Sequence, residues 1–149
     1  MSTISTNEDI HKFIHNINEL YLLQATRVLV CVEGFAAKKL LASWLDKKRY
    51  VKAMHFETGD DLIRAFAESS DKTILVYDLK TPGRNGLEMI SVLRKLPGGG
   101  KNASIIMCGD NLNFQAIEKL QKLGVGAVLN KPFNEEQLSS AFKSLSMPY

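Results

Sequence analysis

The sequence predicts an α/β domain in which helices cover both faces of a five-stranded parallel sheet, a doubly wound arrangement. Short apolar runs alternate strictly with helical patterns along the chain. Most of these runs are continuous, as in strands that are buried on both faces. The chain has 149 residues, of which 45% are hydrophobic and 23% charged. This size and composition are typical of one globular domain.

An amphipathic helix is predicted at the start of the chain, over about residues 9–24. Its apolar residues form one stripe at helical spacing: Ile10, Phe13, Ile14, Ile17, Leu20 and Tyr21. Because an uncovered stripe would expose an apolar patch, we expect it to fold back onto its own domain or to form an interface. That interface would be with a partner protein or with a second copy, as a homodimer. We therefore expect an extension over residues 1–25 and a domain over residues 26–149.

The strands of the predicted sheet differ in how completely they are apolar. Val28–Val32 is a continuous apolar run and predicts the first strand. Val51–Phe56 mixes polar and apolar residues, which indicates an edge strand. Ile74–Asp78 is the strongest candidate for the central strand, and Ile105–Cys108 and Ala127–Leu129 predict the last two. All five should run parallel, because a helix follows each of them.

The helices are predicted from apolar residues that recur on one face. In chain order these are Ala37, Leu40, Leu41 and Trp44; Leu62, Ile63 and Phe66; Leu87, Ile90 and Leu93; Phe114, Ile117 and Leu120; and Leu138, Ala141, Phe142 and Leu145. Pro97 and Gly124 end the third and fourth of these helices. Asn134 and Gln137 form the pattern of a capping box before the last helix.

Chemistry-bearing residues stand at the carboxyl ends of the predicted strands, where sites in such sheets lie. Asp78 ends an apolar strand, where a carboxylate is costly to bury without a charged or hydrogen-bonding partner. Lys131 ends another strand and supplies that charge, and Glu33 adds a second carboxylate after the first strand. A cation such as Mg²⁺ suits these oxygen ligands. The set indicates phosphoryl transfer with Asp78 as the nucleophile.

Two segments resemble the receiver domain of two-component response regulators, a flavodoxin-like fold. Tyr77–Gly86 carries an aspartate followed by Pro82 and Gly86 at the family's offsets, and Asn130–Phe133 resembles its Lys-Pro-Phe loop. The resemblance extends from about Arg27 to Leu145. It implies that the Lys131–Pro132 bond is cis.

The resemblance also implies the roles of the site residues. Asp78 would accept a phosphoryl group from a histidine kinase or phosphotransfer protein, and Lys131 would pair with it. Glu33, Asp78 and the Lys80 carbonyl would coordinate Mg²⁺. We expect a single-domain response regulator that is not an enzyme and that signals by contact with a downstream protein.

Three positions depart from the family pattern. Val32 stands where the family carries the first of two adjacent acids, so Mg²⁺ binding should be weak. Cys108 stands where a Ser or Thr hydroxyl contacts the phosphoryl group, and a thiol donates hydrogen bonds poorly. Val128 replaces the aromatic side chain that reports phosphorylation. These switch positions favour an alternative: a degenerate receiver that binds proteins independently of phosphorylation.

Structural interpretations remain open beside the functional ones. Asp78 could accept hydrogen bonds in an Asx-turn, and Glu33 could cap the amino end of a helix. Lys131 could extend along the surface into solvent, and Cys108 could serve packing alone. His11 and His15 lie off the apolar stripe of the leading helix and fit solvated residues.

Composition excludes several other classes of protein. The net charge of +3 is too small to indicate nucleic-acid binding. No apolar run reaches the length of a membrane span, and the amino terminus lacks the pattern of a signal peptide. The two cysteines, in apolar runs, fit free thiols in a reducing compartment. We therefore expect a cytoplasmic protein. A small-molecule-binding or enzymatic flavodoxin-like domain is disfavoured, because only Gly34 follows the first strand.

Overall fold

The computed structural model describes residues 9–10, 27–48, 52–69, 71–81, 83–98, 100–101 and 103–146. Within these ranges a five-stranded parallel sheet has the order β2-β1-β3-β4-β5. The strands are β1 (Arg27–Cys31), β2 (Lys52–His55), β3 (Thr73–Asp78), β4 (Ala103–Asp110) and β5 (Ala127–Lys131). The order confirms that β3 is central and that β2 lies at an edge.

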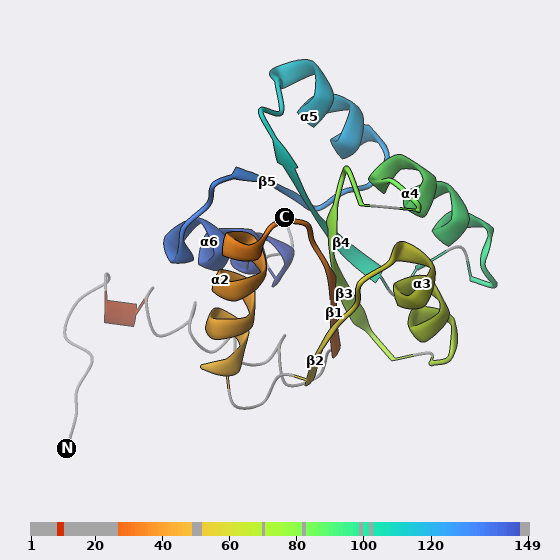
Figure 1. Ribbon diagram of the computed structural model, residues 1–149, viewed down its shortest axis with the longest axis horizontal. Helices are drawn as coiled ribbons and strands as arrows, with labels where there is room; N and C mark the ends of the chain where they lie inside the picture. The colour runs from red at the N-terminus through yellow and green to blue at the C-terminus, as the bar shows by residue number, and fades with distance from the viewer. Residues whose placement is uncertain are drawn as a thin grey trace.

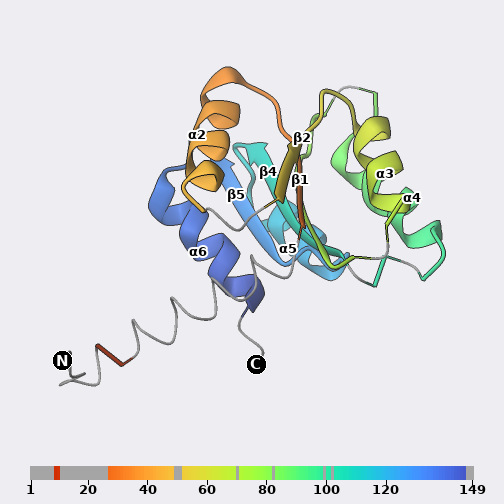
Figure 2. The same ribbon diagram turned by 90° about the horizontal axis from the view of Figure 1, so that it is seen from below.

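Helices cover both faces of this sheet, as Figures 1 and 2 show. The first face carries α2 (Phe35–Asp46) and α6 (Glu135–Ser146), and the second carries α3 (Gly59–Ala67), α4 (Gly86–Lys95) and α5 (Phe114–Lys122). This is the predicted doubly wound arrangement.

Alternation along the strands divides the core into two layers. One set of alternating residues in β1, β3, β4 and β5 packs with α2 and α6: Val28, Val30, Ile74, Val76, Ile106, Cys108 and Leu129. The residues between them pack with α3, α4 and α5: Leu29, Cys31, Leu75, Tyr77, Ile105, Met107 and Val128. Successive side chains of a strand point to opposite faces, so each of these four strands contributes to both layers.

Several helices begin with side-chain caps. The side chains of Thr58, Asn85 and Asn113 accept hydrogen bonds from backbone N–H groups in the first turns of α3, α4 and α5. Before α6, Asn134 and Gln137 exchange hydrogen bonds of 2.8 and 2.9 Å. The capping box predicted from the sequence is therefore present. These bonds satisfy donors that a helix end leaves without a partner.

The predicted boundaries and faces need some correction. The first strand ends at Cys31 instead of Val32, and β4 extends over Ala103–Asp110, beyond the predicted run at both ends. Phe114 is 79% exposed and Leu87 is 38% exposed, although both were expected on buried faces. Each lies in the first turn of its helix. The buried positions that periodicity missed include Leu45 and Met89.

Arg27, the first residue of β1, is bound to α3 and to β3. Its guanidinium donates to the carbonyls of Ala65 and Phe66 at 3.0 and 2.9 Å and to the Thr73 hydroxyl at 2.7 Å. It also lies over the Phe66 ring, 5.9 Å from its centroid. These contacts fix the start of the sheet to the end of α3.

The leading helix predicted from the sequence falls mostly outside the described residues. Asp9 and Ile10 are helical, and Ile10 is 41% exposed. The other stripe residues and both histidines of this segment lie outside the described ranges: Phe13, Ile14, Ile17, Leu20, Tyr21, His11 and His15. Among the helices that are described, none has the length and apolar character needed to cross a membrane.

Candidate functional site

The structure brings the predicted site residues together at the carboxyl edge of the sheet. Asp78 ends β3, Lys131 ends β5, and Cys108 is paired with Asp78 in the register of β3 and β4. Glu33 lies two residues beyond β1. Alternation places the side chains of Asp78 and Cys108 on the face of the sheet that α2 and α6 cover.

Asp78 is 1% exposed, and partners from three segments satisfy both of its carboxylate oxygens. The Lys131 ammonium forms an ion pair with Oδ2. The Glu33 N–H donates to Oδ2 at 3.1 Å, and the Lys80 N–H donates to Oδ1 at 3.1 Å. A buried carboxylate without such partners would be strongly unfavourable.

Lys131 connects the Asp78 carboxylate to the turn after β1. Its Nζ donates to the Glu33 carbonyl at 2.9 Å in addition to the ion pair with Asp78. The side chain is 13% exposed, so it does not extend into solvent. The Lys131–Pro132 bond is cis, as the resemblance implied.

The loop after Asp78 is held by its backbone and by Thr81. The Thr81 hydroxyl and N–H donate to the Asp78 carbonyl at 2.8 and 3.2 Å. The Leu79 N–H donates to the Cys108 carbonyl at 2.8 Å, and the Gly86 N–H donates to the Leu79 carbonyl at 2.9 Å. The bond from the Lys80 N–H to Asp78 makes an Asx-turn. Asp78 therefore forms both the Asx-turn and the ion pair with Lys131.

The three positions that depart from the family pattern are placed as follows. Cys108 is fully buried, and burial, with a smaller effect of the Asp78 charge, raises the pKa of its thiol to about 12. This thiol is therefore neutral at physiological pH, which fits packing better than redox chemistry. Val32 is 3% exposed and packs in the α2 and α6 layer. Val128 is half-buried in the opposite layer.

A groove of about 720 Å³ lies beside Lys131. Its polar lining includes Glu33, Lys131 and Asp110, and its apolar lining includes Phe35 and Phe133. Phe133 is buried, whereas Phe35, the first residue of α2, is 80% exposed. The groove thus joins the charged edge of the sheet to an aromatic side chain in solvent.

The oxygen donors expected for a metal are two carboxylates, from Glu33 and Asp78, and the Lys80 carbonyl. In the described part of the chain no three His, Cys, Asp or Glu residues gather in a group that could hold a metal ion. Mg²⁺ is commonly bound by only one or two carboxylates together with phosphate oxygens and water. The donor set therefore suits Mg²⁺ in its chemistry, with one carboxylate fewer than the family pattern because Val32 is apolar.

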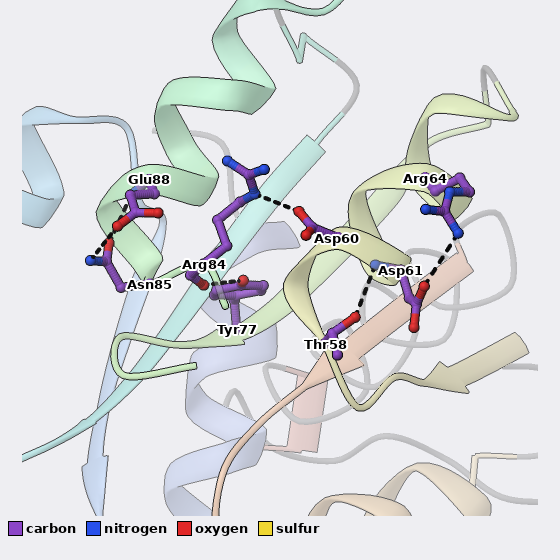
Figure 3. A network of polar contacts seen from close by, with 8 residues as sticks. All are labelled: Thr58, Asp60, Asp61, Arg64, Tyr77, Arg84, Asn85 and Glu88. Carbon is purple, nitrogen blue, oxygen red and sulfur yellow. Dashed lines mark hydrogen bonds and ion pairs between the residues drawn. The ribbon is translucent and has the colours of Figure 1, made fainter. Parts of the chain in front are cut away.

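A polar network that the residue spacing did not predict includes Tyr77, the residue before Asp78 in β3 (Figure 3). The Tyr77 hydroxyl donates to the Arg84 carbonyl at 2.5 Å, and Arg84 Nε donates to Asp60 Oδ1 at 2.8 Å. Burial raises the pKa of Tyr77. One signal was available: a tyrosine in an otherwise aliphatic run carries a hydroxyl that needs a partner when buried. The spacing of residues along the sequence gave no indication that this partner is the Arg84 carbonyl.

Comparison with known proteins gives a consistent result. The family model described as response regulator receiver domain matches residues 28–143. The sensory/regulatory protein RpfC of Xanthomonas campestris pv. campestris is 25% identical over 126 residues, which are 84% of this chain and 17% of that protein. The chain thus spans about a sixth of the length of this relative.

Solved structures show the same fold. The receiver domain of a putative Luxo repressor protein from Vibrio parahaemolyticus superposes with a TM-score of 0.69 at 20% identity, covering 80% of this chain and 91% of the other. The receiver domain of sensor histidine kinase PA1611 from Pseudomonas aeruginosa, with a magnesium ion in its active-site cleft, gives 0.67 at 16% identity, covering 80% and 96%.

Proposed function

Because the chain belongs to the response regulator receiver domain family, we propose that Asp78 accepts a phosphoryl group in a two-component or phosphorelay pathway. The observation that carries this proposal is the ion pair between the buried Asp78 carboxylate and Lys131. A carboxylate nucleophile and a fixed cation in one site are the groups that phosphoryl transfer requires.

The proposed step is a displacement at phosphorus. A carboxylate oxygen of Asp78 forms a bond to the phosphorus, and the bond from phosphorus to the donor breaks. The electron pair of that bond leaves with the donor group, which is a histidine nitrogen of a histidine kinase or phosphotransfer protein. Lys131 offsets the negative charge of the phosphoryl oxygens, and the backbone N–H groups of Glu33 and Lys80 are close enough to Asp78 to assist.

Mg²⁺ is the proposed cofactor. The Glu33 carboxylate, the Asp78 carboxylate and the Lys80 carbonyl would hold it. When bound, the ion would neutralise charge on the phosphoryl oxygens. We propose weak binding, because Val32 supplies no carboxylate on the face where Asp78 lies. The RpfC relative supports a receiver role, and the magnesium ion in the active-site cleft of the PA1611 receiver domain supports Mg²⁺ as the ion.

The test is labelling with a small phosphodonor. We expect the full chain, incubated with acetyl phosphate and Mg²⁺, to gain the mass of one phosphoryl group, and Asp78→Asn to gain none. Asp71→Asn, an exposed aspartate just before the same strand, is the matched control and should be labelled like the wild type. Labelling that persists in Asp78→Asn would show that the acceptor lies elsewhere.

A second function is supported by Cys108 and Val128. The buried Cys108 has no hydroxyl to contact a phosphoryl group, and Val128 has no ring to change position. These residues favour a module that binds proteins through α5, where Phe114 is 79% exposed, independently of phosphorylation. Beryllofluoride, a phosphoryl mimic, separates the two functions. Amide shifts at Asp78 and along α5 support phosphorylation-dependent signalling, whereas a folded sample without shifts supports constitutive binding.

The remaining predictions concern the cellular protein. Downstream signalling through a protein partner, a single-domain architecture, a cytoplasmic location and a homodimer formed through the leading segment stay predictions. The mass of the native protein in a cell fraction and its oligomeric state after gel filtration would test the last three.

A further inference from the structure

The polar network behind Asp78 occupies the face of the sheet opposite to the acceptor carboxylate. Tyr77 is fully buried and belongs to the layer of α3, α4 and α5. Its hydroxyl reaches the Arg84 carbonyl at 2.5 Å, at the far end of the loop that starts with Asp78. We call Tyr77, Arg84, Gly59 and Asp60 the Tyr77 junction (Figure 3 shows all but Gly59).

The first residue of α3, Gly59, leaves space for the Tyr77 hydroxyl. A Cβ at Gly59 would lie 1.8 Å from the Tyr77 hydroxyl oxygen and 3.2 Å from Arg84 Cβ. Only a residue without a Cβ therefore leaves the hydroxyl in its place. The next residue, Asp60, accepts from Arg84 Nε at 2.8 Å. Arg84 is thus held to α3 by its side chain and to β3 by its carbonyl.

The loop between the two ends of the junction carries the groups that serve the acceptor. It includes Lys80, whose N–H donates to Asp78 Oδ1 at 3.1 Å and whose carbonyl is the proposed third metal donor. Thr81 binds the Asp78 carbonyl from the same loop. A shift of Arg84 away from Tyr77 would release the far end of this loop and move Lys80 from the carboxylate.

We infer that Tyr77 and Arg84 are positioning residues for phosphoryl transfer, an inference that rests on the proposed function of Asp78. The Tyr77 hydroxyl binds the Arg84 carbonyl, and the Arg84 guanidinium binds Asp60 at the start of α3. This anchoring of Arg84 keeps the Lys80 N–H and carbonyl at the acceptor. Neither Tyr77 nor Arg84 touches the reacting atoms.

The first test is Tyr77→Phe, which removes one hydrogen bond and retains the ring. We expect acetyl phosphate with Mg²⁺ to label this variant about 3- to 10-fold more slowly, as the loss of one such bond allows. The amide signal of Lys80 in the ¹H–¹⁵N spectrum should also shift. Arg84→Met, which removes the bond to Asp60 and leaves the carbonyl, should slow labelling in the same direction.

The control is Asn113→Ala, which removes the amino-terminal cap of α5. It should destabilise the protein by an amount similar to Tyr77→Phe and leave the labelling rate and the Lys80 amide unchanged. Comparable loss of rate in Asn113→Ala would mean that the slower labelling reflects stability alone, and would overturn the inference.

A double-mutant cycle gives a second test. Gly59→Ala alone forces the Tyr77 hydroxyl away and should reduce the labelling rate strongly. In the Tyr77→Phe background the oxygen is absent and the nearest ring carbon would be 3.0 Å away, so Gly59→Ala should have a smaller effect there. Equal effects in both backgrounds would contradict a role of the hydroxyl.

The outcomes separate this inference from the proposed function. Wild-type labelling together with unchanged labelling of Tyr77→Phe would overturn only the positioning role. No labelling of folded wild-type protein would overturn both. Circular dichroism establishes folding of each variant, and if Tyr77→Phe does not fold, Arg84→Met decides the question.

Discussion

Val32 shows how one apolar side chain alters the chemistry expected of this site. It is 3% exposed and packs in the same layer as Cys108, on the sheet face where Asp78 lies. Its methyl groups stand where a carboxylate would add a hard oxygen ligand. The charge that faces Asp78 comes from Lys131, whose ammonium is fixed by the Glu33 carbonyl. The Asp78 carboxylate is therefore balanced mainly by a side-chain cation.

Val32→Asp should strengthen Mg²⁺ binding on the order of tenfold, because affinity for a hard cation rises with the number of charged ligands. Isothermal titration of the full chain with MgCl₂ measures this change. Val32→Asn, which has the size of aspartate without its charge, is the matched control and should bind Mg²⁺ much more weakly than Val32→Asp. Equal affinities of the two variants would mean that the position does not face the metal.

At the same scale, the site was only partly predictable. Asp78, Lys131 and Glu33 could be found because strand ends in parallel sheets meet at one edge. Tyr77 could not be assigned a partner, since its bond to Arg84 depends on how the loop closes against α3. Gly59 likewise appears ordinary in the sequence, and its need to lack a Cβ follows only from the Tyr77 hydroxyl beside it.

Among the elements, periodicity predicted where helices form better than which residues they bury. Leu62, Ile63 and Phe66 are buried in α3 as predicted. Phe114 shares the helical spacing of Leu120 but occupies the first turn of α5, immediately after its cap at Asn113. Helical spacing identifies residues on one side of a helix and does not reveal how far the underlying sheet extends.

The cap of α4 provides a test at this scale. Asn85 accepts from the Glu88 N–H at 2.9 Å, and its Nδ2 donates to Glu88 Oε1 at 3.0 Å. Asn85→Ala should lower the free energy of unfolding by about 1 kcal/mol, as measured by urea denaturation. Glu88→Gln keeps a side-chain acceptor and the backbone bond, so it should change stability by less. A larger loss in Glu88→Gln would point to the Glu88 charge as the stabilising group.

Across the whole molecule, the two core layers share the same strands. Val76 and Tyr77 are adjacent in β3 and belong to opposite layers. Trp44, the only tryptophan of the chain, lies in the α2 and α6 layer with its ring 4.8 Å from that of Phe142. Unfolding of one layer removes the strands on which the other depends, which favours a cooperative transition.

This arrangement predicts that a destabilising substitution in one layer lowers the unfolding midpoint measured by a probe in the other layer. Leu93 is fully buried among α3, α4 and α5, and Leu93→Ala should cost about 2–5 kcal/mol. Trp44 fluorescence and far-UV circular dichroism should detect this loss at the same denaturant concentration. Leu123→Ala, at a 37% exposed leucine, should have little effect. A Trp44 transition that stays at its wild-type midpoint in Leu93→Ala would mean that the layers unfold separately.

The contacts of Arg27 have a mechanical consequence. Arg27 is clamped to the end of α3 and to Thr73 at the start of β3. Tension applied to the chain ahead of Arg27 is therefore shared between a helix and the central strand before β1 can be peeled from the sheet. Thr73 and Asp78 are the two ends of a strand of 6 residues, which spans about 17 Å. A pull applied at Arg27 thus enters the domain beside Thr73, at the opposite end of β3 from Asp78.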